Sequence, residues 1–154
     1  MNFWMDNSLE ELLKVIKKAN IIIINDEEAL QLSGKDTLFN AADEILKMGP
    51  EHVVIKKGEH GAMLFNKSEF FTIPAYPVKK VKDPTGAGDT FAGGFAGFLS
   101  QNNDLGFETL KLAVVHGTVM ASFCVEGFGT SQMEKLNNER FQSRLKEFKN
   151  YTRY

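Results

Sequence analysis

The feature that most constrains the fold of this chain is the alternation of short apolar runs with helical patterns. Ile21–Ile24 is a continuous run of β-branched residues, and His52–Lys56 is a second short run of apolar character. Runs of this length are typical of strands that are buried on both faces of a sheet. Helical patterns begin at Ser8, Asp26 and Thr37, before and between these runs. This order predicts an α/β fold with a layered sheet.

A hairpin and three further helices are also predicted. Ala62–Phe65 leaves a turn at Gly58–Gly61, and Glu69–Ile73 follows a turn at Asn66–Ser68, so we expect two strands at one edge of the sheet. One later helix is predicted from the glycine-rich turn at Asp83–Gly88 through about Leu99, and two more at about residues 107–125 and 138–149.

Polar or glycine-rich segments follow the predicted elements at three places. They are Asn25–Glu28, Lys56–Gly61 and Asp83–Asp89. The first two follow strands directly, whereas the third follows a loop. In open α/β sheets, ligands bind beyond the carboxyl ends of the strands. We therefore expect these segments to contribute to one ligand site.

The composition excludes several classes of protein. The 154 residues fit one domain, and the apolar fraction of 43% is ordinary for a globular protein. A net charge of −2 gives no reason to expect nucleic acid or an anionic membrane as a partner. The single cysteine, Cys124, cannot form an internal disulfide, which favours a cytoplasmic location. The longest apolar run, Ile21–Ile24, is too short to span a bilayer.

The most informative segment has the sequence DPTGAGDTFAGG and begins at Asp83. Gly86, Ala87 and Gly88 have little or no side chain, so their backbone N–H groups can approach a ligand closely. A helix begins here, and its first N–H groups lack internal partners, which makes an anion site suited to phosphate. Asp89 falls in the first turn, where its carboxylate can accept a proton from an attacking hydroxyl. The alternative is a glycine-rich helix start with a capping aspartate.

Glycines inside the same helix require an explanation. Gly93, Gly94 and Gly97 each destabilise a helix interior by about 1 kcal/mol relative to alanine. We infer that this side of the helix lets another backbone approach closely.

Three other groups of residues have structural explanations when they are considered alone. Asn25 and Glu28 have the spacing of a capping-box pair. Lys56–Gly61 is compatible with a hairpin turn that binds nothing. His116, in an apolar helix, is compatible with a core histidine, and Asp83 with a turn before proline.

The run that begins at Asp83 resembles the C-terminal signature of the ribokinase-like (PfkB) carbohydrate kinases. This resemblance implies the C-terminal portion of a ribokinase-like three-layer αβα sandwich, a Rossmann-like fold, and an ATP-dependent kinase that phosphorylates a hydroxyl of a sugar or nucleoside. In that family the glycine-rich segment forms an anion hole and its aspartate is the catalytic base. Carried over, Gly86, Ala87 and Gly88 would stabilise the transferring phosphoryl group, and Asp89 would deprotonate the acceptor.

The resemblance also implies two cation sites. Asn25 and Glu28 match an N-x-x-E motif that organises Mg²⁺ and its waters, a role that is compatible with capping. Asp83 and Thr85 match positions near a site for a monovalent cation such as K⁺ in some members.

The resemblance also implies positions that contact the nucleotide. A T-x-G-x-x-G segment lies at the phosphates in the family, and this chain has lysine in place of the threonine. The implied contacts are Lys56, Gly58 and Gly61 at the phosphates, and His116, Val119 and Met120 at the adenine.

The resemblance covers only the C-terminal half of the family fold. The other half of such kinases supplies most of the acceptor site and a lid, so we expect a single domain, residues 1–154, with little activity alone. Asn2–Met5 reads as the end of a buried strand, and we therefore expect a truncated chain. An exposed apolar sheet edge would then favour self-association.

Two other functions have different sequence requirements. A nucleotide-binding module that acts through a partner chain would not need Asp89, which this chain retains. A dinucleotide-dependent oxidoreductase would need a G-x-G-x-x-G segment after the first strand, and this sequence has none there.

Overall fold

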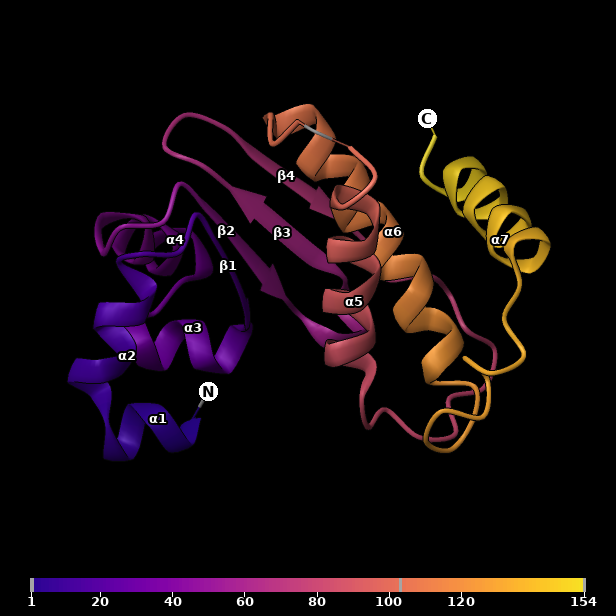
Figure 1. The fold of residues 1–154 in the computed structure, drawn as a ribbon, viewed down its shortest axis with the longest axis horizontal. Coiled ribbons are helices and arrows are strands. Elements are labelled where there is room, and N and C mark those ends of the chain that lie inside the picture. The colour runs from indigo at the N-terminus through magenta and orange to yellow at the C-terminus, as the bar shows by residue number, and fades with distance from the viewer. Residues whose placement is uncertain (1, 103, 154) are drawn as a thin grey trace. The chain divides into compact units, whose positions relative to one another are not determined.

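The protein is described here by a computed structural model that covers residues 2–102 and 104–153 (Figure 1). Its contacts divide the chain into two compact units, Met1–Gly58 with Ala62–Thr72 and Glu59–Gly61 with Ile73–Tyr154. The elements in chain order are α1 (Asn2–Asn7), α2 (Leu9–Ile16), β1 (Ile21–Asn25), α3 (Asp26–Ser33), α4 (Leu38–Lys47), β2 (His52–Lys56), the 3₁₀ turn η1 (Gly58–His60), β3 (Ala62–Phe65), β4 (Phe70–Ile73), α5 (Ala87–Leu99), α6 (Phe107–Cys124) and α7 (Asn138–Tyr151).

The four strands form one sheet in the order β1-β2-β3-β4. β1 and β2 are parallel, with Ile21 opposite His52 and Asn25 opposite Lys56. β2 and β3 are antiparallel, with Val53 opposite Phe65. The α/β class and the hairpin at one sheet edge are therefore confirmed. The parallel register also places the ends of β1 and β2 side by side.

The prediction that Ile21–Ile24 is a fully buried strand is wrong. Ile24 is buried, but Ile21, Ile22 and Ile23 are only half-buried. The reason is that β1 forms one edge of the sheet, as Figure 1 shows, so it has a described neighbouring strand on one side only. The apolar run indicates that these residues favour a strand, but it does not indicate that the strand is completely buried.

The core of the first unit lies between the sheet and its helices. Thr37 caps α4 by accepting a hydrogen bond from the backbone N–H of Asn40. The apolar face of this helix is buried, with Ala41, Ala42 and Ile45 fully enclosed. These residues pack with Val53 and Ile55 of β2 in one core cluster. Such burial of branched side chains is the main stabilisation of a unit of this kind.

In the second unit, α5 and α6 pack side by side, as Figure 1 shows. A Cβ added to Gly94 would lie 3.1 Å from the Cα of Gly117 and 2.7 Å from Cγ of Met120. The predicted close approach of another backbone therefore occurs at Gly94. The same interpretation is wrong for Gly93 and Gly97, because a Cβ on either would meet nothing within 4 Å.

The amino-terminal residues form a helix rather than the end of a strand. α1 buries Met5 but leaves the side chains of Phe3 and Trp4 67% and 54% exposed. The two rings contact each other edge to face, with centroids 5.5 Å apart. The strand interpretation of Asn2–Met5 is therefore wrong. Among the described helices, none has both the length and the apolar character needed to cross a membrane.

Candidate active site

The first predicted segment forms a complete capping box at the start of α3. The amide oxygen of Asn25 accepts a hydrogen bond from the Glu28 backbone N–H at 2.7 Å. The Glu28 carboxylate in turn accepts one from the Asn25 backbone N–H at 3.2 Å. Both side chains are half-buried. This reciprocal pair fixes two oxygen-bearing side chains at the carboxyl end of β1.

Lys56 lies beside this capping box. It is the last residue of β2 and stands opposite Asn25 in the parallel register. Adjacent strands are about 4.8 Å apart, so the ammonium-bearing residue and the Asn25–Glu28 pair share one end of the sheet. The first unit therefore brings together three of the predicted site residues, with both signs of charge.

Two glycines shape the turn that follows Lys56. Gly58 has φ +55° and begins the 3₁₀ turn, and Gly61 has φ +91°. A Cβ on Gly61 would lie 2.0 Å from the carbonyl oxygen of Ile73 and 2.6 Å from the carbonyl carbon of Pro74. Gly61 is therefore required both by its backbone angle and by this close approach. Gly58 has open space around it, so only its backbone angle favours glycine.

The glycine-rich run forms a tight turn into α5. The Asp83 carboxylate accepts a hydrogen bond from the Thr85 backbone N–H at 2.9 Å, and this bond lowers the pKa of Asp83 below its ordinary value. Gly86 is the N-cap in the left-handed region, with φ +80°, and no side chain caps the helix. No side chain therefore covers the N-terminus of α5, where helix-terminal N–H groups can bind an anion, although the N–H of Ala87 already donates to the Pro84 carbonyl oxygen at 3.1 Å.

Asp89 lies in the first turn of α5, as predicted, and its side chain is exposed. Ala87 and Gly88, which precede it, are half-buried. An exposed carboxylate beside a set of helix-terminal N–H groups combines a proton acceptor with a site for negative charge. This pairing suits transfer of a phosphoryl group to a hydroxyl.

The turn is attached to the carboxyl end of α6. The Val125 carbonyl oxygen accepts hydrogen bonds from the backbone N–H groups of Lys82 and Asp83, at 2.8 and 3.4 Å. The thiol of Cys124 lies 3.5 Å from the Thr85 carbonyl oxygen, to which it donates. Cys124 is buried, as expected of a small apolar residue on a helix.

His116 and Met120 line a hollow of about 270 Å³ in the second unit. The imidazole ring is half-buried between Phe98 and Phe141, with ring centroids 4.3 and 5.2 Å away. Burial lowers the pKa of His116, and the positive charge of Lys149 lowers it further. Val119, by contrast, is fully buried and is absent from the lining of this hollow.

Gly93 and Gly97 also line this hollow, on the α5 side. They follow Asp89 at intervals of four residues, so all three lie on one face of the helix. At 1.5 Å per residue, Gly97 is about 12 Å from Asp89 along the axis. The absence of side chains at these glycines keeps one wall of the hollow open.

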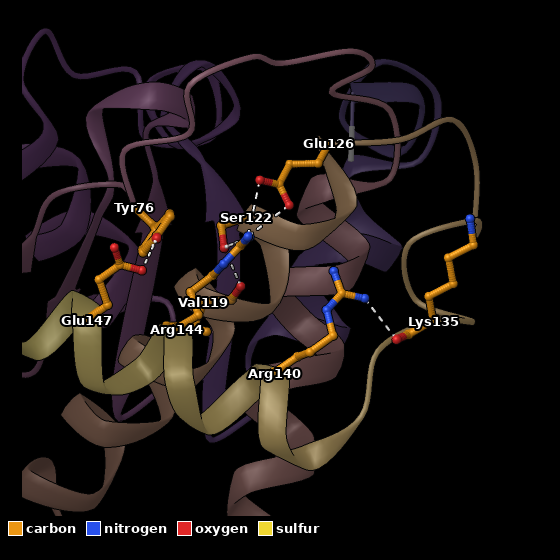
Figure 2. A network of polar contacts seen from close by, with 8 residues as sticks. All are labelled: Tyr76, Val119, Ser122, Glu126, Lys135, Arg140, Arg144 and Glu147. Atoms are coloured by element: carbon orange, nitrogen blue, oxygen red, sulfur yellow. Dashed lines mark hydrogen bonds and ion pairs between the residues drawn. The ribbon is translucent and has the colours of Figure 1, made fainter.

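A polar network on α7 was not predicted (Figure 2). Nη2 of Arg144 donates to both carboxylate oxygens of Glu126, at 3.1 and 2.9 Å, and Nη1 donates to Ser122 Oγ at 3.1 Å. Nearby, the Tyr76 hydroxyl donates to Glu147 at 2.6 Å. Burial and the hydrogen bond to Glu147 raise the pKa of Tyr76 to about 12. The residues that form these hydrogen bonds are 18 to 71 positions apart in the sequence, so no local pattern predicts the network.

The predicted site residues therefore fall into three local groups. Asn25, Glu28 and Lys56 lie together in the first unit. The residues of the Asp83–Asp89 run lie on one turn of the second unit. His116 and Met120 share the hollow. Among the described residues, no group of three or more histidine, cysteine or acidic side chains could hold a metal ion.

Comparison with known proteins identifies the family. The sequence profile described as pfkB family carbohydrate kinase matches residues 2–136. The chain belongs to this family of carbohydrate kinases. The predicted resemblance is thereby confirmed, together with the ribokinase-like α/β fold.

Two curated relatives are nucleoside kinases of archaea. The cytidine kinase of Thermococcus kodakarensis is 36% identical over 96 residues, which cover 61% of this chain and 34% of the relative. The nucleoside kinase of Methanocaldococcus jannaschii is 34% identical over 122 residues, covering 79% of this chain and 38% of the relative. The chain thus spans little more than a third of the length of these relatives.

Solved structures show the same fold. Aminoimidazole riboside kinase from Salmonella enterica, complexed with aminoimidazole riboside and an ATP analogue, gives a TM-score of 0.80 at 27% identity. The superposition covers 92% of this chain and 47% of that protein. The Methanocaldococcus jannaschii nucleoside kinase gives a TM-score of 0.75 at 28% identity, covering 93% of this chain and 45% of that one.

Proposed function

We propose that this chain is the nucleotide-binding and catalytic part of an ATP-dependent kinase that phosphorylates a hydroxyl of a sugar or nucleoside. The observation that carries the proposal is the start of α5, where Gly86 opens an uncapped helix N-terminus beside the exposed carboxylate of Asp89. Family membership and the nucleoside kinases among the relatives support this class of reaction.

In the proposed reaction, Asp89 accepts the proton of the acceptor hydroxyl. The hydroxyl oxygen then forms a bond to the γ-phosphorus of ATP, while the bond from that phosphorus to the bridging oxygen of ADP breaks. The backbone N–H groups at Gly86, Ala87 and Gly88 stabilise the negative charge on the transferring group, and that of Ala87 also donates to the Pro84 carbonyl oxygen at 3.1 Å. Donors aimed at developing charge are typically worth about 3–4 kcal/mol each.

Nucleotide contacts are proposed for each unit by itself. Lys56 would bind the phosphates through its positive charge. Gly58 and Gly61, in the turn that follows, would let the backbone approach the phosphates closely. His116 and Met120 would border the base. An ATP analogue is bound by the riboside kinase from Salmonella enterica, which supports ATP as the donor. Val119 would then support the base site only from within the core.

Mg²⁺ fits the Asn25–Glu28 pair through waters. The pair offers carboxylate and amide oxygens, which are the ligands that Mg²⁺ prefers, but the capping box already engages one oxygen of each. Outer contacts through water and the phosphates of the nucleotide suit such a pair. When bound, Mg²⁺ would neutralise the charge of the phosphates. A monovalent cation such as K⁺ is proposed near Asp83 and Thr85, where it would strengthen the anion site.

The acceptor is proposed to bind mainly to the part of the kinase fold that this chain does not match. The chain covers only 34–38% of the two nucleoside kinase relatives. Positioning of the acceptor against Asp89 accounts for many kcal/mol in a transfer of this kind. We therefore expect residues 1–154, treated as one nucleotide-binding domain, to bind ATP and to transfer phosphate slowly.

The test is a calorimetric titration of the chain with ATP, with and without Mg²⁺, beside a phosphate-transfer assay with sugars and nucleosides. Saturable binding is expected in the wild type and in Asp89→Asn, because the substitution removes a negative charge near the phosphates. Any transfer should disappear in Asp89→Asn. Transfer that persists in this variant would exclude Asp89 as the base.

Glu108→Gln is the matched control. Glu108 is also an exposed carboxylate in the first turn of a helix of the second unit, but it pairs with Lys111 and lies outside the proposed site. It should change neither binding nor transfer. A folded chain that does not bind ATP would overturn the nucleotide-binding proposal. The alternative is a non-catalytic nucleotide-binding module. It would be favoured if Asp89→Asn still binds ATP and, when introduced into the full-length protein, leaves the biological function unchanged.

A further inference from the structure

The segment that leads into the anion site is attached at both of its ends. Near its start, the Tyr76 hydroxyl donates to Glu147 of α7 at 2.6 Å. At its end, the backbone N–H groups of Lys82 and Asp83 donate to the carbonyl oxygen of Val125, which follows α6. The position of the anion site therefore depends on the position of the last turn of α6.

That last turn is held by one side chain of α7 (Figure 2). Arg144 donates to both carboxylate oxygens of Glu126 and to the hydroxyl of Ser122. Ser122 Oγ in turn donates to the carbonyl oxygen of Val119 at 2.6 Å. The partners of Arg144 thus lie on either side of Val125 in the sequence. The carbonyl oxygen of Val125 accepts the hydrogen bonds from Lys82 and Asp83.

The environment of Arg144 makes this attachment rigid. The side chains of Arg144 and Glu126 are only 15% and 30% exposed. The guanidinium lies 3.7 Å from the ring centroid of Phe123 and 4.9 Å from that of Tyr76. A charge that is stacked, paired and largely removed from water has few alternative positions. Its cation also complements the negative end of the α6 dipole.

We propose that Arg144 is a positioning residue, which fixes the backbone of the anion site by clamping the last turn of α6. The relevance of this positioning to catalysis rests on the proposed function. Arg144 does not touch the anion site itself. It acts through Glu126 and Ser122 on Val125, and through the two hydrogen bonds of Val125 on the turn that begins at Asp83.

The experiment measures backbone hydrogen exchange of the isotopically labelled chain by NMR. Arg144→Met keeps the packing on Phe123 and removes the hydrogen bonds. The amides of Lys82 and Asp83 should then exchange about tenfold faster, which corresponds to loss of hydrogen bonds to a charged group. Amides of the buried residues Ala113 and Val114 in α6 report global stability and should change little.

Arg140→Met is the matched control. Arg140 lies one turn before Arg144 on α7, and its guanidinium is 5.5 Å from the centroid of the same Phe123 ring. It donates instead to the Lys135 carbonyl oxygen. It should leave Lys82 and Asp83 unchanged. Glu126→Gln, a milder variant, should accelerate the same two amides. Combining it with Arg144→Met should add little if the pair acts as one unit.

Equal rates in Arg144→Met and wild type would overturn the proposal. Equal acceleration at Lys82 and Val114 would also overturn it, because Arg144 would then contribute only to overall stability. A parallel ATP titration separates this result from the proposed function. A wild-type chain that fails to bind ATP contradicts the nucleotide site, whereas the exchange rates still decide whether Arg144 positions the turn.

Discussion

At the scale of single residues, the two turn glycines share a left-handed backbone angle but differ in the space around them. Gly61→Ala should destabilise the protein by more than about 3 kcal/mol, because a Cβ 2.0 Å from the Ile73 carbonyl oxygen adds a clash to an unfavourable φ of +91°. Chemical denaturation measures this change as a fall in the free energy of unfolding.

The control for this prediction is Gly58→Ala in the same turn. Its φ of +55° is also left-handed, but the position has open space around it. The expected loss is about 1–2 kcal/mol, which is the strain of the backbone alone. Similar losses for the two variants would show that the turn relaxes around the methyl group that Gly61→Ala introduces.

A residue's role could be predicted from the sequence when its interaction partners lie close to it along the chain. Asn25 and Glu28 were predicted as a capping box because both partners lie within one helical turn, and the box is present. Arg144 and Glu126 were missed because their contact is set by the packing of α7 on α6. The catalytic role of Asp89 stays a prediction, since only its place in the first turn of α5 is observed.

At the scale of elements, α5 contains glycines with different environments. Gly97→Ala should stabilise the protein by about 0.5–1 kcal/mol, because alanine raises helix propensity and its Cβ meets nothing within 4 Å. Gly94→Ala is the contrasting variant. It should destabilise by about 1–3 kcal/mol, because its Cβ would lie 2.7 Å from Met120 and 3.1 Å from the Gly117 backbone.

Thermal and urea unfolding of the two variants would check this contrast. A stabilising effect of Gly94→Ala would mean that α5 and α6 move apart without loss of packing. A destabilising effect of Gly97→Ala would show that the open side of α5 packs more closely than the structure indicates.

Element boundaries were predictable because capping and hydrophobic periodicity are local. Thr37 and Asn25 cap their helices at the predicted positions, and β2 has the predicted bounds. The strand interpretation of Asn2–Met5 fails because its three apolar residues, Phe3–Met5, are too few to distinguish the period of a helix from that of a strand. The half-burial of β1 depends on its place at the edge of the sheet, which no run of isoleucines specifies.

At the scale of the whole molecule, exposed apolar surface leads us to predict self-association. Phe3 and Trp4 are exposed on α1, and β1 is the edge strand. Sedimentation should detect dimers or larger species that become fewer in a Phe3→Ser/Trp4→Ser variant. Phe128→Ser, which removes another highly exposed aromatic ring, should have a smaller effect. A monodisperse monomer at high concentration would contradict this prediction.

The stability of the whole chain should also fall as the pH is lowered from about 7.5 to 5.5. Burial lowers the pKa values of His52 and His116 from the ordinary 6.5, although Glu51 opposes the effect at His52. The unfolded chain therefore binds more protons than the folded chain once the pH falls below about 6.5. Stability is complete above that pH and declines as the pH falls through the lowered pKa values.

Urea unfolding at pH 7.5, 6.5 and 5.5 measures this decline, and the window separates histidines from carboxylates. Asp83 and Glu147 have lowered pKa values, but carboxyl groups take up protons mainly near pH 4 and below. His116→Asn should flatten the decline between pH 7.5 and 5.5, whereas His60→Asn, at a side chain that is 77% exposed, should leave it in place. Stability that is constant or rises toward pH 5.5 in the wild type would show that the rings of Phe98 and Phe141 do not exclude water from His116.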